Sequence, residues 1–304
     1  MYDLIIIGGG PAGLTAGIYA ARARLNACLL ERGLPGGMAA TTEKIENYPG
    51  FPDGIGGPEL MMNFQAQAEK LGLVIRSEEV TEISLVGPVK QVHTTAGVLE
   101  AQTIIIATGS YPQKLGVPGE DELYGQGVSY CATCDGAFFR NREIVVVGGG
   151  DAAIDEAIFL TRFASKVTIV HRREGFRAAQ ISVERAQANP KIAFHLNAVV
   201  QSIEGNNGVE KVVLKDVHTG ELSELNAQGV FIYVGQIPNG SYLGDTLELT
   251  EQGYVKADAK MHTNVAGVFV AGDIRETPLR QVATAVGDGA VAAMEAEKYI
   301  AGQH

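Results

Sequence analysis

The sequence is poor in cysteine, in long apolar runs and in positive charge. With 3 Cys in 304 residues and no positively charged leader ahead of the first apolar run, it does not fit a disulfide-built secreted protein, and we expect a cytoplasmic location. No run approaches the roughly 18 apolar residues of a membrane-spanning helix. Lys and Arg total 24 against 35 Asp and Glu, a net charge of -11, which argues against a surface for nucleic acid or for an anionic membrane.

Glycine, by contrast, is abundant. The chain has 38 glycines, well above the average of about 7% of residues, and they show no collagen-like period. Such glycines predict tight turns and loops that approach phosphate groups closely. The length is sufficient for about two domains of ordinary size.

Two segments of the chain repeat one order of elements, namely a short apolar strand, a glycine-rich turn, an Ala-rich helix and a second strand. These elements are expected at residues 4–7, 14–24 and 27–31 in the first copy, and at 144–147, 152–163 and 167–170 in the second. This order is typical of the βαβ unit of a parallel sheet. The spacing also repeats, because 23 residues separate Gly8 from Glu31 and Gly148 from His171.

The second copy is expected to be inserted into the first. The runs 103–109 and 229–235 look like equivalent strands, and both are followed by Pro and Gly residues that fit crossover linkers. We therefore predict an α/β fold of two Rossmann-like dinucleotide-binding domains. Residues 1–112 and 241–304 would form the first domain, and residues 113–240 the inserted one.

The first glycine-rich turn predicts a dinucleotide site. Gly8, Gly10 and Gly13 follow a strand and open a helix in the pattern G-x-G-x-x-G, so main-chain N–H groups and the helix N-terminus can hold a pyrophosphate. Glu31, at the end of the next strand, is placed to accept hydrogen bonds from a ribose with a free 2'-hydroxyl. This preference makes FAD the natural candidate. The alternative is a glycine-rich turn that binds no ligand.

The second turn differs from the first at one informative position. His171 stands where the first copy has Glu31, and Arg172, Arg173 and Arg177 follow it. A carboxylate would repel a 2'-phosphate, whereas guanidinium groups bind phosphate through paired hydrogen bonds, so this copy is expected to prefer NADP over NAD. The alternative is a solvated cluster of charges at a strand end.

Between the two turns lies a C-x-x-C pair, Cys131 and Cys134. A zinc site would need further Cys or His ligands at short spacing, and the one remaining cysteine, Cys28, lies in an apolar strand where we expect a core thiol. No metal site is therefore predicted. A dithiol between two dinucleotide sites is instead typical of an electron relay, and two buried structural thiols remain the alternative.

Together these motifs resemble those of the low-molecular-weight, bacterial-type thioredoxin reductases, flavoproteins of the pyridine nucleotide-disulfide oxidoreductase class, over nearly the whole chain. The resemblance implies FAD and NADPH as cofactors. The FAD contacts that it implies are Gly8, Gly10, Pro11, Ala12, Gly13, Glu31, Arg32, Gly36, Gly37, Met38, Asn47, Val80, Ala107, Thr108, Gly109, Gly272, Asp273, Arg280, Gln281 and Val282. The NADPH contacts that it implies are Gly148, Gly150, Asp151, Ala152, Ala153, His171, Arg172, Arg173 and Arg177.

Two residues depart from the pattern of these enzymes. Met38 stands where they commonly have Gln after the double glycine, so a side-chain hydrogen bond to the flavin is lost. Leu279 stands where relatives often carry Tyr. The first departure bears on the flavin potential and the second on local packing.

The resemblance also implies the course of the reaction. Electrons would pass from NADPH through FAD to Cys131 and Cys134 and on to the disulfide of thioredoxin, with Cys134 facing the flavin and Cys131 attacking thioredoxin. Asp135 would exchange the proton, although it could also serve as a helix N-cap. At a helix start, the dipole is expected to favour a thiolate.

In this family the NADPH domain rotates to present the dithiol and the nicotinamide in turn, and the enzymes are homodimers. A related enzyme could take its electrons from ferredoxin, but the retained basic motif argues against that alternative. A non-enzymatic nucleotide sensor would leave the dithiol without a role.

Overall fold

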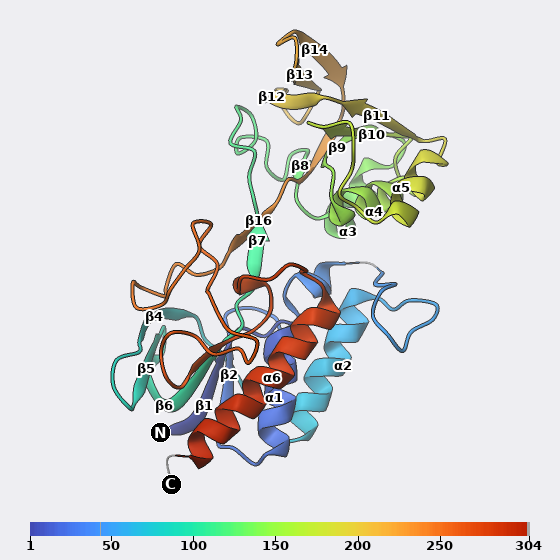
Figure 1. The fold of residues 1–304 in the computed structure, drawn as a ribbon. Coiled ribbons are helices and arrows are strands. Elements are labelled where there is room, and N and C mark those ends of the chain that lie inside the picture. The colour runs from blue at the N-terminus through green and yellow to red at the C-terminus, as the bar shows by residue number, and fades with distance from the viewer. Residues whose placement is uncertain (43, 303–304) are drawn as a thin grey trace. The chain divides into compact units, whose positions relative to one another are not determined.

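The computed structural model describes residues 1–42 and 44–302, except for the side chain of Cys134, and divides into two compact units (Figure 1). Unit 1 consists of Met1–Tyr111 and Ile237–His304, and unit 2 of Pro112–Gln236. The chain thus leaves unit 1 once, builds unit 2 and returns. The boundaries expected from the sequence, after residues 112 and 240, lie one and four residues further along.

A seven-stranded sheet forms the centre of unit 1. Its strands are β1 (Tyr2–Ile7), β2 (Ala27–Glu31), β3 (Val74–Ser77), β4 (Val80–Ser84), β5 (Lys90–Thr94), β6 (Gly97–Ile106) and β17 (Val268–Val270). The order is β3-β2-β1-β6-β5-β4, and β17 pairs with β6. The pairs among β1, β2, β3, β6 and β17 are parallel, whereas β4 and β5 pair antiparallel.

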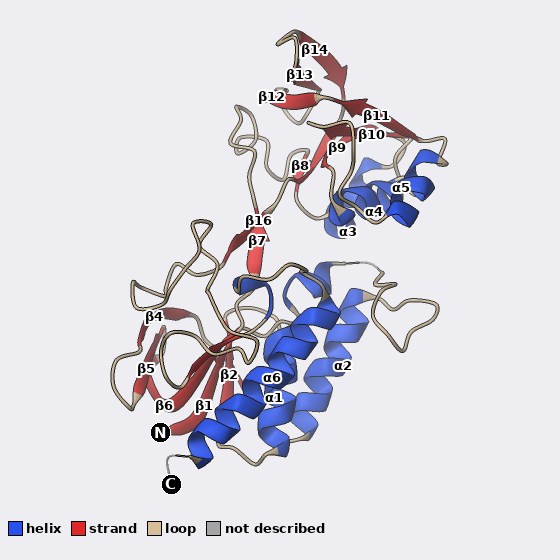
Figure 2. Cartoon of the chain, in the orientation of Figure 1, coloured by secondary structure: helices blue, strands red, loops and turns tan. Residues whose placement is uncertain are grey.

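Helices cover one face of this sheet. They are α1 (Pro11–Arg22), α2 (Gly57–Lys70) and α6 (Val282–Ala301), with short 3-10 helices η1 (Gly37–Thr41) and η3 (Gly272–Ile274). Figure 2 shows α1, α2 and α6 side by side. Leu4 and Ile6 of β1 pack in the core under α1 and α6, and Ile5 and Ile7 in the core on the other face. β1 is apolar at every one of these positions because a parallel strand is buried on both faces.

Unit 2 repeats this plan on a smaller scale. Its parallel sheet has the strands β8 (Val128–Ser129), β9 (Glu143–Gly148), β10 (Lys166–His171), β11 (Ile192–Leu196) and β15 (Gly229–Tyr233), in the order β11-β10-β9-β15-β8. The helices are α3 (Ala132–Asp135), α4 (Asp151–Leu160) and α5 (Gln180–Gln187), with the 3-10 helix η2 (Gly136–Phe139). A second, antiparallel sheet contains β12 (Ala198–Glu204), β13 (Lys211–Asp216) and β14 (Leu222–Asn226).

The two segments that cross between the units pair with each other as a ribbon of β7 (Ser110–Pro112) and β16 (Gln236–Pro238). At the unit 1 end, the N–H of Asn239 donates to the carbonyl of Gly109 over 2.9 Å. The Thr108 hydroxyl donates to the carbonyl of Asn239 over 2.8 Å. The expected flavin segment at Thr108 and Gly109 is therefore fixed to the returning chain.

The predicted fold class is confirmed: both βαβ copies form, in an α/β fold with two Rossmann-like units. Several element ends differ from the prediction. The helices expected to reach residues 24 and 163 end at Arg22 and Leu160. Residues 267–273 hold only a short strand, Val268–Val270, because Gly272 adopts a φ of 76° and turns the chain into η3. Within the described residues, no helix is long and apolar enough to cross a membrane.

Candidate dinucleotide and dithiol sites

The first glycine-rich turn brings the end of β1 against β6 and leaves its outer side open. A Cβ on Gly8 would lie 2.5 Å from the carbonyl oxygen of Ala107, and one on Gly13 would lie 1.8 Å from the carbonyl oxygen of Gly8. Around Gly10, by contrast, no described atom lies within 4 Å of a built Cβ, and no side chain caps the start of α1. Helix N–H groups that lack a protein acceptor fit a bound pyrophosphate.

Glu31 lies at this turn, as predicted, and its carboxylate also holds the loop. Oε2 accepts the N–H of Gly9 over 2.8 Å, and Oε1 accepts the N–H of Gly33 over 3.0 Å. A Cβ on Gly9 would lie 3.2 Å from the Glu31 side chain. Each carboxylate oxygen has a second lone pair, so both can still accept a bond from a ribose hydroxyl.

A second turn, at Gly36 and Gly37, lies against the Gly8 turn. The N–H of Gly36 donates to the carbonyl of Gly9 over 2.8 Å, and a Cβ on Gly37 would lie 3.3 Å from the Cα of Gly10. Met38 follows in η1 with 44% of its surface exposed. Pro11 and Ala12 begin α1, so the FAD contacts expected from the Gly8 turn and from the Gly36 turn lie together in unit 1.

Two of the predicted FAD residues that are far apart in the sequence meet in the structure. The amide nitrogen of Asn47 donates to the side-chain oxygen of Gln281 over 2.9 Å. Gln281 is also the N-cap of α6, where it forms a capping box with Thr284. Val282 is the first residue of that helix. The interaction joins two segments that sequence reasoning had placed at the flavin only through resemblance.

Asp273 and Arg280 carry polar groups without a partner among the described residues. Burial raises the pKa of the Asp273 carboxyl above its ordinary value, with a smaller opposing effect from Arg280. The Nε of Arg280 is buried without a hydrogen bond in the described part of the chain. Its guanidinium carbon lies 4.1 Å from the ring centroid of Tyr254, a cation-π contact. The half-buried carboxylate of Asp273 and the buried Nε of Arg280 fit a polar ligand such as a ribityl chain.

A buried ion pair holds the short helix η3 that contains Asp273, and sequence reasoning missed it. Asp288 of α6 accepts two hydrogen bonds from Arg275, over 2.6 Å and 2.9 Å, and a third from the N–H of Gly272 over 3.1 Å. These bonds fix both ends of η3. They are charge-assisted and therefore short and directional.

The remaining predicted FAD residues are less closely gathered. Arg32 lies 3.8 Å from Glu79 in an exposed ion pair. Val80 begins β4 and packs half-buried against the core on the far face of the sheet. Within the described residues, neither forms a hydrogen bond or ion pair with the glycine-rich turns, so their roles rest on the resemblance alone.

In unit 2, the second glycine-rich turn repeats the backbone of the first. Gly148 adopts a φ of 150°, and Gly150 precedes α4, whose start no side chain caps. A Cβ on Gly149 would lie 2.3 Å from the imidazole ring of His171, so only glycine fits under that ring. Asp151 and Ala152 open the helix, and Ala153 is fully buried.

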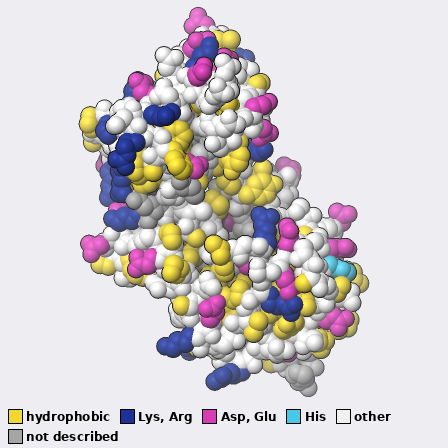
Figure 3. All heavy atoms as spheres, turned by 180° about the vertical axis from the view of Figure 1, so that it is seen from behind, with side chains coloured by type: hydrophobic (Ala, Val, Ile, Leu, Met, Phe, Trp, Pro, Cys, Tyr) yellow, Lys and Arg dark blue, Asp and Glu magenta, His cyan; other side chains and the backbone are white. Residues whose placement is uncertain are grey.

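His171 and the arginines after it lie at this turn. The N–H of Arg177 donates to the carbonyl of Gly149 over 2.8 Å, which brings the basic segment back to the glycines. Burial, and then the positive charges of Arg172, Arg173 and Arg177, lower the pKa of His171. The three arginines are exposed and form no ion pair with a described residue. Basic side chains gather along one edge of unit 2 in Figure 3.

The dithiol motif lies at the start of α3, in the same unit. Cys131 is disulfide-bonded, whereas Cys28 is a free thiol that is 0% exposed, as expected for a core residue. The side chain of Cys134 lies outside the described part. The hydroxyl of Thr133 is 3.4 Å from the Sγ of Cys131.

Ser129, which sequence reasoning missed, ties Asp135 to Cys131. Its hydroxyl donates to Oδ2 of Asp135 over 2.6 Å and accepts the N–H of Cys131 over 3.0 Å. Tyr233, at the end of β15, accepts the N–H of Ala132 through its hydroxyl over 2.9 Å. Asp135 is the last residue of α3 and holds the N-cap position of η2, where its side chain makes no capping hydrogen bond.

A buried carboxylate anchors the residue just before the dithiol. Glu120 is 1% exposed, and it accepts the N–H groups of Leu115 and Gly116 over 2.8 Å and 2.6 Å. The Tyr130 hydroxyl donates to the same carboxylate over 2.7 Å. Burial and this carboxylate raise the pKa of Tyr130. The linker that enters unit 2 is thus bound to the dithiol segment.

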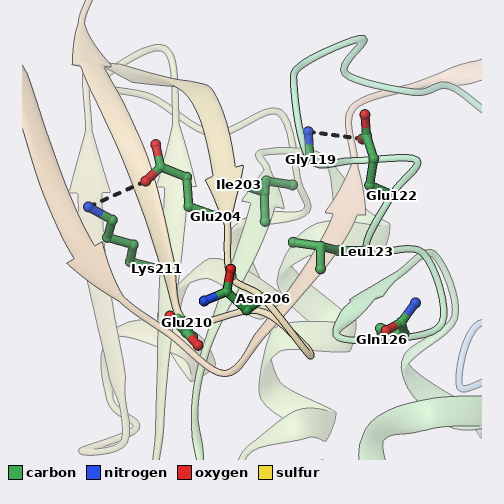
Figure 4. A pocket seen from close by; sticks show the side chains of 10 residues that line it. Gly119, Glu122, Leu123, Gln126, Ile203, Glu204, Asn206, Glu210 and Lys211 are labelled. Atoms are coloured by element: carbon green, nitrogen blue, oxygen red, sulfur yellow. Dashed lines mark hydrogen bonds and ion pairs between the residues drawn. The ribbon is translucent and has the colours of Figure 1, made fainter.

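A hollow of about 520 Å³ elsewhere in unit 2 has no such chemistry (Figure 4). Three of its charged side chains are already engaged, since Lys211 pairs with Glu204 over 3.3 Å and Glu122 accepts the N–H of Gly119 over 3.1 Å. Among the described residues there is also no group of three or more His, Cys, Asp or Glu side chains that could hold a metal. The two glycine-rich turns and the dithiol remain the candidate sites.

Comparisons with known proteins identify the family of this chain. The family model for pyridine nucleotide-disulphide oxidoreductases matches residues 2–289. A thioredoxin reductase from Bacillus subtilis is 48% identical over 99% of this chain and 95% of its own length.

Solved structures give the same relationship at two levels of similarity. The thioredoxin reductase of Lactococcus lactis matches with a TM-score of 0.98 and 47% identity over 99% of this chain and all of its own. A ferredoxin-flavin thioredoxin reductase from Clostridium acetobutylicum matches less well, with a TM-score of 0.55 and 31% identity over 99% of this chain and 98% of its own. From the family model and the near full-length identity, we conclude that the chain belongs to the pyridine nucleotide-disulphide oxidoreductases and, among them, to the thioredoxin reductases.

Proposed function

We propose that this chain is a thioredoxin-disulfide reductase that uses NADPH and FAD. The observation that carries the proposal is the disulfide-bonded Cys131 beside Asp135, in a chain 48% identical to a thioredoxin reductase over 99% of its length. When bound, FAD would supply the two-electron chemistry that links the hydride of NADPH to the reduction of a disulfide. The residues of the chain bind and orient the two nucleotides and handle the protons and thiols.

Unit 1 is proposed to hold FAD. The N–H groups at the start of α1 would bind the pyrophosphate, and Glu31 would accept the ribose hydroxyls while it keeps Gly9 in place. Asp273 would accept a bond from the ribityl chain, with η3 held by Asp288. The open N–H groups, the partnerless carboxylate of Asp273 and the buried Nε of Arg280 are the features of this structure that fit the group.

Unit 2 is proposed to hold NADPH and to select it over NADH. The start of α4 would bind the pyrophosphate, as α1 does in unit 1. Arg172, Arg173 and Arg177 are exposed beside the Gly149 turn, so their guanidinium groups can close on a 2'-phosphate. The lowered pKa of His171 keeps its ring neutral at neutral pH, which suits a position packed against main chain.

The dithiol is proposed to carry the electrons out. The Cys131 thiolate attacks one sulfur of the thioredoxin disulfide, forms a mixed disulfide and releases the other thioredoxin sulfur as a thiolate. The Cys134 thiolate then attacks Cys131, which re-forms the enzyme disulfide and frees reduced thioredoxin. Asp135, held by Ser129, takes up or returns the proton at this turn.

Thioredoxin is the partner implied by this function, and we further propose that the chain works as a homodimer in the cytoplasm. The small number of cysteines supports the location, and the resemblance to homodimeric reductases supports the dimer. A ferredoxin-dependent variant is less well supported, because the ferredoxin-flavin relative is 31% identical and the Lactococcus lactis enzyme 47%. Rapid anaerobic bleaching of the flavin by NADPH would separate the two donors.

The dithiol step can be tested by Cys134→Ser. We expect this variant to keep its FAD, because the binding groups lie in unit 1, and to lose reduction of thioredoxin altogether. The measurement is flavin absorbance per protein together with NADPH-dependent reduction of a thioredoxin. Turnover of a protein disulfide by Cys134→Ser would overturn the proposed function.

A further inference from the structure

The hydroxyl of Thr133, inside the C-x-x-C motif, points at the sulfur that is proposed to attack thioredoxin. Its Oγ1 lies 3.4 Å from the Sγ of Cys131. Because Cys131 is disulfide-bonded in this structure, the sulfur has no hydrogen to give. The hydroxyl hydrogen of Thr133 is therefore the one that lies between the two atoms.

Two main-chain N–H groups beside this sulfur are already used. The N–H of Cys131 donates to Ser129, and the N–H of Ala132 donates to Tyr233. Helix α3 contains only four residues, Ala132–Asp135, so it offers few further N–H groups and little aligned dipole. We expected the helix start to stabilise a thiolate, but two of the N–H groups there are bonded to Ser129 and Tyr233.

The charges around the motif are negative. Burial raises the pKa of Tyr233, and the negative charges of Glu156 and Asp135 raise it further. Asp135 accepts a hydrogen bond from Ser129 and stands four residues after Cys131. Negative charge of this kind disfavours a thiolate, and a hydrogen-bond donor at the sulfur would oppose that effect.

We propose that Thr133 is a catalytic residue that donates its hydroxyl hydrogen to the Cys131 thiolate and so keeps it available for attack on thioredoxin. The inference rests on the proposed function, in which Cys131 is the attacking thiol. In the step itself, the S–S bond of thioredoxin breaks, a bond between Cys131 and one thioredoxin sulfur forms, and the electron pair leaves on the other thioredoxin sulfur. The hydroxyl transfers no proton, and its hydrogen bond weakens as the charge leaves the sulfur.

The expected size of the effect follows from how thiol reactivity depends on pKa. Loss of a donor to a thiolate is expected to raise the thiol pKa by about one unit, which lowers the thiolate fraction about tenfold below that pKa. The remaining thiolate is more basic and about threefold more nucleophilic, so the net loss in attack rate is about threefold. The pH midpoint is therefore a more sensitive readout than turnover.

The test uses the FAD-loaded protein in a Cys134→Ser background, where Cys131 is the accessible thiol and the buried Cys28 serves as an internal control. Alkylation of Cys131 by iodoacetamide is followed by mass spectrometry from about pH 5 to pH 9.5, a range set by thiol pKa values. Thr133→Val should raise the midpoint by about one pH unit, and Thr133→Ser should restore it. Thr219→Val, the same substitution in an exposed turn of unit 2, should leave it unchanged.

An unchanged midpoint in Thr133→Val, or a midpoint in Thr133→Ser equal to that in Thr133→Val, would overturn the proposal. If Thr133→Val does not retain FAD, Thr133→Ala carries the same prediction, since it also lacks the hydroxyl. With Cys134 present, Thr133→Val should lower kcat/KM for thioredoxin about threefold with no change in KM for NADPH. Alkylation needs no thioredoxin, so failure of this inference is distinct from failure of the unsubstituted enzyme to reduce thioredoxin.

Discussion

The two glycine-rich turns of this chain use the same backbone and differ in the residue that ends the second strand. In unit 1 the Glu31 carboxylate accepts the N–H of Gly9, while in unit 2 the His171 ring covers Gly149. A Cβ on Gly9 would lie 3.2 Å from the Glu31 side chain, and the His171 ring fills the space of a Cβ on Gly149. The position 23 residues after the first glycine therefore shapes the loop, and in unit 2 the charge beside it comes from the arginines that follow.

Because of this difference, the groups that would bind a pyrophosphate are not the groups that would distinguish one nucleotide from another. The helix starts of α1 and α4 are alike, since neither is capped by a side chain. We expect selection to come from the strand ends, where one unit has the Glu31 carboxylate and the other has three arginines that form no ion pair with a described residue. The first arrangement would repel a 2'-phosphate and the second would bind it.

The largest effect is expected at the position that has room for a side chain in the turn of unit 2 and none in the turn of unit 1. Gly13 corresponds to Ala153, and a Cβ on Gly13 would lie 1.8 Å from the carbonyl oxygen of Gly8. Gly13→Ala should lower FAD affinity at least about 100-fold, because the helix must move off the strand. Flavin absorbance per protein measures this. Ala153→Gly is the matched change in unit 2, and it should cost only about 1 kcal/mol in unfolding free energy and leave FAD bound. Equal FAD loss in both would contradict the comparison.

The next largest effect should distinguish the two nucleotides. Arg172→Ala together with Arg173→Ala should raise KM for NADPH about 30-fold or more, because two charge-assisted phosphate contacts are lost. KM for NADH should change less than about twofold, since NADH has no 2'-phosphate. Steady-state kinetics with both coenzymes gives the answer. Similar increases for NADPH and NADH would refute the assignment of the arginines to the phosphate.

A smaller effect is expected at Asp273. Its pKa is raised by burial, so the folded protein holds a proton that the unfolded chain releases above about pH 3.9. The free energy of unfolding therefore falls as the pH rises from the pKa of Asp273 in the unfolded chain to its higher pKa in the folded protein, and the full loss is present at pH 7. Asp273→Asn should raise Tm of the FAD-free protein at pH 7 by about 1–2 °C, with the gain lost in acid.

The same variant should bind FAD about tenfold more weakly, because the amide offers a neutral acceptor in place of a carboxylate. Differential scanning calorimetry and flavin titration measure the two effects. Asp288→Asn serves as the control for distortion of η3, which Asp288 holds through Gly272 and Arg275. Asp273→Asn that lowers Tm at pH 7 would show that the carboxylate stabilises the empty site.

The sequence was sufficient for features that depend on local spacing. Gly8, Glu31, Gly148 and His171 are fixed by a strand, a turn and a helix of set length, so their meeting follows from the 23-residue repeat. Contacts between distant segments could not be predicted this way. Asn47 and Gln281 are 234 residues apart, and only the fold brings them within 2.9 Å.

Sequence reasoning also missed the residues that hold the dithiol. Ser129 and Tyr233 belong to no motif, and Tyr233 reaches Ala132 only because β15 ends beside α3. The prediction that the helix dipole favours a thiolate did not foresee that these side chains accept the first N–H groups. A four-residue helix within a C-x-x-C motif cannot be told from a longer one by composition.

The central claim is that electrons enter through the arginine-bearing unit and leave through Cys131 to thioredoxin. The most direct test is reduction of a thioredoxin by the purified yellow protein, with NADPH and NADH compared at equal concentration. The account predicts rapid reduction with NADPH and a kcat/KM at least about 30-fold lower with NADH. No reduction of thioredoxin with NADPH, or equal rates with the two coenzymes, would contradict it.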